Sequence, residues 1–130
     1  MRVPKYKAWI KSEGHEGYMT EVTGINFPTG FILIPMSDDP RESRRIDFEE
    51  CTLLLFTGLR DINKKEIYEG DIVNARIYGD DPFNPQPIYY EGSAFWVDYK
   101  FPDFDRTSLC CFPEGVEVIG NIYENPELLK

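Results

Sequence analysis

Turn-forming residues interrupt this chain so often that it has little room for long helices. The 130 residues include 10 glycines and 10 prolines, and both residue types break regular structure where they occur. Between them lie short stretches in which apolar and polar side chains alternate; in residues 6–10, Tyr6, Ala8 and Ile10 share one side. Alternation with a period of two is typical of β-strands. The sequence therefore predicts a mainly β fold made of short strands.

The overall composition is that of one folded domain. Apolar residues make up 42% of the chain and charged residues 28%, a mixture that argues against general disorder. We expect residues 1–130 to form a single domain. No stretch approaches the ~18 consecutive apolar residues of a membrane span, and the charged N-terminus does not resemble a signal peptide. These features predict a cytoplasmic protein.

The sequence has no residue pattern typical of a zinc site or of a nucleophilic cysteine. The cysteines are Cys51, Cys110 and Cys111, without a CxxC pair, and His15 is the single histidine, expected in an exposed turn. A nucleophilic cysteine needs a cationic neighbour to lower its pKa, and none adjoins these cysteines in sequence. We therefore expect reduced structural thiols, no bound metal and no cofactor.

Two polar, proline-containing stretches predict long loops at residues 35–45 and 79–87. The apolar runs 31–34 and 53–56 predict buried strands, the second ended by Thr57-Gly58. Loops commonly carry binding residues while the regular elements fix the frame. We therefore predict the binding surface to include Arg41, Arg44 and Arg45 of the first loop and Phe83 of the second.

Two local signals predict sharp changes of chain direction. In residues 68–73 (Tyr-Glu-Gly-Asp-Ile-Val), Gly70 can take a positive φ and Asp71 can bond neighbouring amides before a buried strand begins at Ile72. Residues 116–123 predict a strand with a bulge at Gly120. Asn125-Pro126 then predicts a single helical turn.

These blocks resemble the YopX family of small phage and prophage proteins. The matching segments are residues 5–9, 55–73 and 118–129, in the same order and at similar distances from the chain ends. This chain has Asn63-Lys64 where the family usually carries Asn-Gly, and Leu55-Phe56 where the family tends to have Gln-Tyr. The resemblance implies an SH3-like barrel and a phage or prophage origin, but it implies no activity and no catalytic residue. The residues assigned to the structural motif are Trp9, Thr57, Gly58, Tyr68, Gly70, Asp71, Ile72, Gly120, Asn121 and Tyr123.

The sequence predicts a protein that binds without catalysis, either to a protein partner or to a second copy of itself. Two alternative functions stay open. Several aspartates could gather around a divalent cation, as in a metal-dependent nuclease. Several aromatic residues could instead stack on single-stranded nucleic acid, although a net charge of −9 disfavours nucleic acid and anionic membranes. The aspartates are Asp80, Asp81, Asp98, Asp103 and Asp105, and the aromatic residues are Tyr89, Tyr90, Phe95, Trp96, Tyr99 and Phe101.

Overall fold

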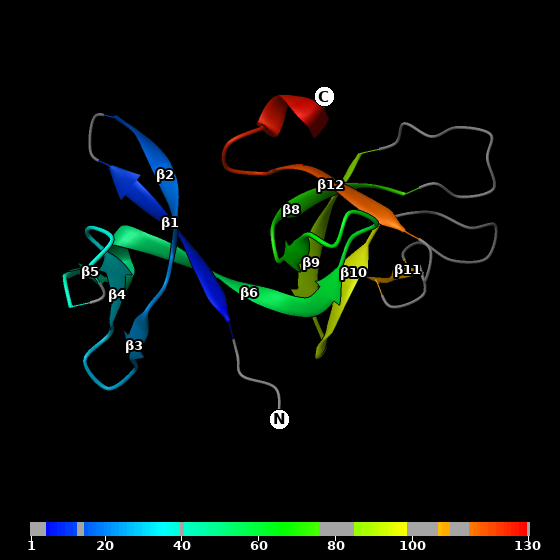
Figure 1. Cartoon of the computed structure of the whole chain (residues 1–130). Coiled ribbons are helices and arrows are strands. Elements are labelled where there is room, and N and C mark those ends of the chain that lie inside the picture. The colour runs from blue at the N-terminus through cyan, green and yellow to red at the C-terminus, as the bar shows by residue number, and fades with distance from the viewer. Residues whose placement is uncertain are drawn as a thin grey trace. The chain divides into compact units, whose positions relative to one another are not determined.

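The protein, described here by a computed structural model, is built of short antiparallel strands (Figure 1). The structure describes residues 5–12, 15–39, 41–75, 85–98, 107–109 and 115–129. The short 3-10 turns η1 (Phe48–Glu50) and η3 (Pro126–Leu129) follow strands in the described part of the chain. The strands are β1 (Tyr6–Ser12), β2 (His15–Glu21), β3 (Gly24–Asn26), β4 (Phe31–Pro35), β5 (Ser43–Asp47), β6 (Cys51–Arg60), β7 (Glu66–Tyr68), β8 (Asp71–Ala75), β9 (Gln86–Glu91), β10 (Ala94–Val97), β11 (Thr107–Ser108) and β12 (Val116–Asn121). The prediction of a mainly β fold is confirmed.

The chain forms two compact units, residues 1–55 and 56–130. Strand β6 belongs to both: residues 51–55 pair with β1, and the remainder pairs with β7. Each unit has its own cluster of buried apolar side chains. That residues 1–130 act as one domain stays a prediction.

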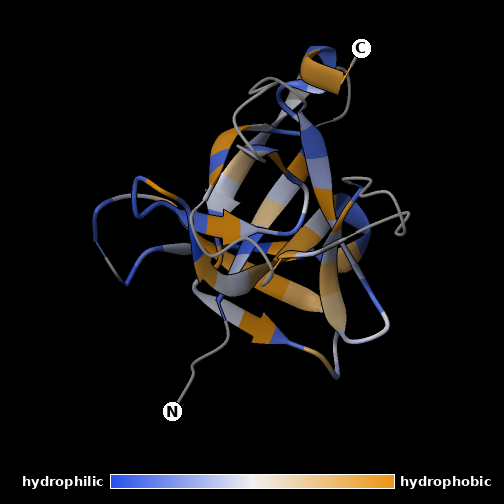
Figure 2. Cartoon of the chain, turned by 90° about the vertical axis from the view of Figure 1, so that its right-hand side faces the viewer, coloured by the Kyte–Doolittle hydropathy of each residue, from blue (hydrophilic) through white to orange (hydrophobic). Residues whose placement is uncertain are grey.

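The first unit consists of two small sheets packed face to face. One sheet contains β2, β1 and the start of β6, and the other contains β3, β4 and β5. Ala8 and Ile10 of the first sheet pack with Ile32, Ile34 and Ile46 of the second, and each of these residues is at most 4% exposed. Alternate residues of β1 and β4 therefore face the core, and Figure 2 shows hydrophobic and hydrophilic residues interleaved along the strands.

The first predicted loop is shorter than expected. Strand β4 extends to Pro35 and β5 begins at Ser43, so the connection covers residues 36–42 and the loop prediction is wrong for residue 35 and for residues 43–45. β5 pairs with β4 along its whole length. Ile46 is the only apolar residue of β5, which leaves too little alternation to recognise in the sequence. The strand forms because the backbone groups along that edge of β4 need hydrogen-bond partners.

The hairpin of β1 and β2 corrects a second expectation. His15 was predicted in a turn, but it begins β2 and its backbone pairs with Ser12. The pairing register shifts between Ile10 and Ser12, and the two strands continue beyond this irregularity. The same stretch of sequence has the residue types that are typical of a turn. Further along β2, a β-carbon on Gly17 would lie 2.7 Å from the Trp9 ring. Glycine at this position therefore lets the indole lie against β2.

The second unit is organised around a sheet with the order β11-β10-β9-β8-β12. Ile67 of β7 joins Val73, Ile88, Val97 and Val116 of this sheet in one buried cluster. The second predicted loop is corrected at its end, since residues 86–87 belong to β9, while residues 79–84 lie outside the described part of the chain.

Candidate interaction surface

Thr57 and Gly58 form a bulge within β6, which contradicts the prediction that they end the strand. Gly58 has a φ of 85°, and the register of the β6–β7 pair shifts at this point. The Thr57 hydroxyl donates to the Ile67 carbonyl (2.8 Å) and accepts from the Leu59 N–H (3.1 Å). These two bonds replace ladder bonds that a bulge interrupts, so the strand continues to Arg60.

Asp71 holds the turn between β7 and β8. Its Oδ2 accepts a hydrogen bond from the Tyr68 N–H at 2.8 Å. Gly70 has a φ of 86°, which confirms the predicted positive φ. Ile72 follows as the start of a buried strand and is 0% exposed. The hydrogen bond between Asp71 and Tyr68 therefore stabilises the turn between β7 and β8.

Alanine at Gly70 is expected to lower the free energy of unfolding by about 1–2 kcal/mol, because a β-carbon strains this left-handed backbone. The backbone cannot easily relax, since the Gly70 N–H donates to the Ile88 carbonyl and its carbonyl accepts from the Ile122 N–H. Urea unfolding measures the difference. Gly92→Asn is the matched control, because Gly92 also has positive φ but its β-carbon would meet nothing within 4 Å. Asparagine tolerates this conformation, so an equal loss in the control would contradict the interpretation.

Two asparagines brace the end of β12. Oδ1 of Asn121 accepts from the N–H groups of Tyr123 (3.0 Å) and Glu124 (2.8 Å). Oδ1 of Asn125 accepts from the Asn121 N–H at 3.2 Å. A β-carbon on Gly120 would lie 2.6 Å from that Asn125 oxygen, so glycine makes room for it. The predicted bulge is confirmed by a register shift between β12 and β8 at this glycine.

The three arginines of the predicted binding surface do not share one face. Arg41 lies in the β4–β5 connection and donates to Asp39 at 3.1 Å, a contact that holds the pKa of the Asp39 carboxyl below its ordinary value. Arg44 and Arg45 are successive residues of β5 and therefore point to opposite sides of the sheet. Nε of Arg45 lies 3.3 Å from Oδ1 of Asp47. Of the three, Arg45 lies on the same side as the outward residues of β4.

The outward side of the β3–β4–β5 sheet carries apolar side chains and one charge of each sign. Phe31 and Leu33 of β4 are half-buried there, opposite Asp47 and Arg45 of β5. The Arg45 guanidinium carbon lies 4.1 Å from the Phe31 ring centroid, a cation–π contact. Gly24 of β3 lies opposite Leu33 and adds no side chain beside it. We name the surface formed by Phe31, Leu33, Arg45 and Asp47 the β4 face.

Sequence reasoning missed this face because the run 31–34 was predicted to be buried as a whole. The structure buries Ile32 and Ile34 and turns Phe31 and Leu33 outward. Where four successive residues are apolar, hydropathy does not show which side of the strand faces solvent. Antiparallel sheets commonly have one solvated side, so the pairing of β4 with its neighbours, and not its hydropathy, decides which residues face outward.

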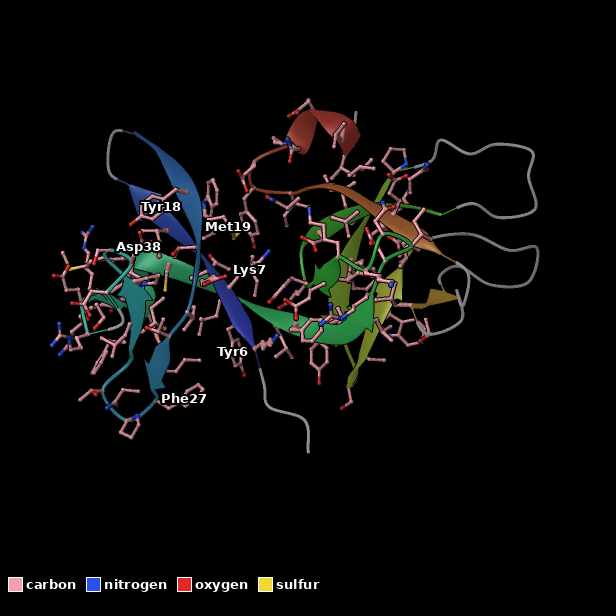
Figure 3. The ribbon with its side chains drawn as sticks, viewed as in Figure 1. Tyr6, Lys7, Tyr18, Met19, Phe27 and Asp38 are labelled. Carbon is pink, nitrogen blue, oxygen red and sulfur yellow. The ribbon has the colours of Figure 1, made fainter. Side chains whose placement is uncertain are left out.

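Phe27 lies in the turn that joins β3 to β4, where Figure 3 labels its side chain. Its side chain is 66% exposed. The turn is braced, because the Asn26 side chain accepts from the Thr29 N–H (3.0 Å) and the Asn26 carbonyl accepts from the Gly30 N–H (2.9 Å). The Phe27 ring also meets the Phe48 ring edge-on, with 6.1 Å between centroids. An exposed aromatic residue on a preordered turn is well suited to anchor a protein interface.

The structure tests the predicted acidic site only in part. Of the five aspartates, Asp98 is described, and its Oδ1 accepts a hydrogen bond from the Tyr89 hydroxyl at 2.8 Å. Among the described residues, no group of three or more His, Cys, Asp or Glu is arranged to hold a metal ion. Asp80, Asp81, Phe83, Tyr99, Phe101, Asp103, Asp105, Cys110 and Cys111 lie outside the described residues.

The aromatic residues proposed to stack on nucleic acid divide between two sides of the β9–β10 hairpin. Tyr89 and Trp96 are cross-strand partners and share one side. Tyr90 and Phe95 share the other, with ring centroids 5.0 Å apart. These four rings therefore do not form one continuous stacking platform.

Cys51 packs in the core of the first unit. It is 7% exposed, and burial raises the pKa of its thiol. Its Sγ lies 3.6 Å from the carbonyl oxygen of Asp47. A raised pKa disfavours the reactive thiolate, which agrees with the expected structural role.

The cores, bulges and braced turns define a small all-β protein of two compact units. The chain belongs to the YopX family, described as YopX protein, which it matches over residues 5–130. The resemblance noted in the sequence is thereby confirmed over nearly the whole chain.

A solved structure gives an independent comparison. The chain is similar to protein EF1440 from Enterococcus faecalis, known from a crystal structure, with 28% sequence identity and a TM-score of 0.63. The similarity covers 98% of this chain and 99% of the other. No curated protein matches the chain. In the part of the chain that the structure describes, no helix has the length and apolar character needed to cross a membrane.

Proposed function

We propose that this protein is a non-catalytic accessory protein of a phage or integrated element. It acts in the cytoplasm by binding another protein through the β4 face and Phe27. The observation that carries this proposal is the 66% exposure of Phe27, an aromatic side chain that its turn holds in place. Keeping an aromatic ring in water costs free energy that burial in an interface recovers.

The strand order of the first unit supports an SH3-like barrel as the frame of this surface. β1 pairs with both β2 and β6, and β3, β4 and β5 form the second sheet. The 3-10 turn η1 stands between β5 and β6, immediately before the last strand. We take this order of strands as support for an SH3-like frame. A fold of this kind hosts many functions, so the binding role rests on the surface and not on the frame.

The use of the motif's polar side chains also favours binding over catalysis. Thr57, Asp71 and Asn121 each direct a side-chain oxygen to a backbone group of their own chain. Such bonds stabilise bulges and turns. These three residues of the family motif therefore have a role in folding.

Serine at Phe27 is expected to reduce recovery of the protein partner at least tenfold, because anchor residues in interfaces are often worth ~2 kcal/mol or more. The measurement is a tagged pull-down from nuclease-treated host lysate, quantified by mass spectrometry. Tyr18→Ser is the matched control: Tyr18 is also an exposed aromatic of the first unit, 41% exposed, but it lies on β2 in the other sheet (Figure 3).

The same pull-down discriminates the competing functions. A partner retained equally by Phe27→Ser and the unsubstituted protein would contradict this surface assignment. Partners that disappear on nuclease treatment would instead favour the nucleic-acid alternative.

A further inference from the structure

We propose that the β4 face joins two copies of this chain, with Arg45 of each copy paired to Asp47 of the other. This inference rests on the proposed binding function and names the partner as a second copy. It uses the β4 face defined above.

The charge distribution favours a second copy at this face. The chain carries a net charge of −9, so two copies repel each other over most orientations. Residues 1–55 contribute seven basic and nine acidic side chains, a balance of −2. On the β4 face itself, Arg45 and Asp47 cancel. A strongly charged partner therefore gains little there, whereas a second copy presents the same two opposite charges.

The two charges are placed to pair reciprocally. Arg45 and Asp47 lie two residues apart on one side of β5, a spacing of about 7 Å along the strand. In an interface with two-fold symmetry, each contact occurs twice. A two-fold axis that passes between these side chains sets Arg45 of each copy against Asp47 of the other, and the ion pair forms in both directions.

Arg45 can bind Asp47 of the other copy and keep its bond to Asp47 of its own chain. Its Nε already bonds to Asp47 in the same chain, and its guanidinium lies over Phe31. In the described part of the chain, the Nη groups of Arg45 make no hydrogen bond. A guanidinium has five donors in a fixed fork, so these groups suit a carboxylate from the other copy.

The small area of the β4 face predicts weak association between two copies. It is three strands wide and about five residues long, or roughly 14 by 17 Å from strand spacing and rise. That area is far below the ~800 Å² per partner of a standard interface. Phe31 and Leu33, both half-buried, supply its apolar contacts. We therefore expect a concentration-dependent dimer with a Kd in the micromolar range or weaker.

Sedimentation velocity over a wide concentration range, with the full chain, tests the dimer. The unsubstituted protein is expected to shift toward twice the monomer mass as concentration rises. Arg45→Asp and Asp47→Arg should each weaken association at least tenfold, because each sets like charges against one another. An equimolar mixture of the two variants should associate again, since every contact between unlike copies is then complementary.

The control is Arg44→Asp, which changes charge by the same amount as Arg45→Asp on the opposite side of β5. It should leave the dissociation constant within about twofold of the unsubstituted value. Circular dichroism confirms that each variant is folded before association is compared.

Three results would overturn the inference: a monomer at the highest concentration, unchanged association of either single variant, or a mixture that stays monomeric. A monomer that still captures another protein through Phe27 would leave the proposed function standing and remove this inference. Recovery of dimer by the mixture, without any other protein captured, would support the second copy as the partner.

Discussion

Replacing Asp61 with alanine is expected to lower the free energy of unfolding by about 3 kcal/mol, because it removes the acceptor of three backbone bonds at once. Oδ1 of Asp61 accepts from the N–H groups of Asn63 (2.8 Å) and Lys65 (2.9 Å), and Oδ2 accepts from the Val118 N–H (3.0 Å). The residue is 7% exposed. The carboxylate thus fixes the β6–β7 turn and ties it to β12.

Chemical unfolding in urea near neutral pH measures this loss. Asp39→Ala is the matched control, since Asp39 forms its ion pair with the exposed Arg41 side chain in a surface turn. Exposed pairs are usually worth ~1 kcal/mol or less. Equal effects of the two substitutions would contradict the role assigned to Asp61.

The same carboxylate predicts a direction for the pH dependence of stability. Burial by itself raises the pKa of Asp61, but the N–H groups of Val118, Lys65 and Asn63, with the Lys65 ammonium, lower it further than burial raises it. The net pKa therefore lies below its ordinary value of 3.8. A group with a depressed folded pKa stabilises the fold above its unfolded pKa and loses that contribution as pH falls through the folded pKa. The stability difference between the unsubstituted protein and Asp61→Ala should accordingly narrow as pH falls below 3.8.

Local signals in the sequence were sufficient for the turn at Gly70 and the bulge at Gly120. Gly70 and Asp71 predicted their turn because a positive φ favours glycine and an aspartate can cap nearby amides. Gly120 predicted a bulge for a related reason, since an interior glycine weakens a strand. Each of these features depends on residues close together in sequence. Sequence reasoning therefore described them without any knowledge of the tertiary structure.

The candidate interaction surface depended on information that local patterns do not contain. The run containing Phe31 and Leu33 is uniformly apolar, so its solvent side appears only once β3 and β5 have paired with β4. In the sequence, Thr57 and Gly58 were predicted to end a strand. The Thr57 hydroxyl instead donates a hydrogen bond to the Ile67 carbonyl, and β6 continues beyond both residues. The Asp61 bond to Val118 joins residues 57 positions apart. Such contacts are set by the tertiary fold.

Alanine at Ile32 is expected to lower the free energy of unfolding by about 3 kcal/mol, because it leaves a cavity in a closely packed core. Ile32 is 0% exposed and lies between the two sheets of the first unit. Ile88→Ala is the matched variant in the core of the second unit, where Ile88 is 2% exposed. Thermal unfolding followed by tryptophan fluorescence measures both.

The two tryptophans make this comparison a test of whether the units unfold together. Trp9 reports on the first unit when Trp96 is replaced by phenylalanine, and Trp96 reports on the second in the reverse variant. Because β6 supplies residues to both units, unfolding either one removes pairing partners from a strand that the other uses. We therefore expect Ile32→Ala to lower the midpoint seen by both reporters equally. A shift seen by Trp9 alone would show that residues 1–55 and 56–130 unfold independently, which contradicts a single domain.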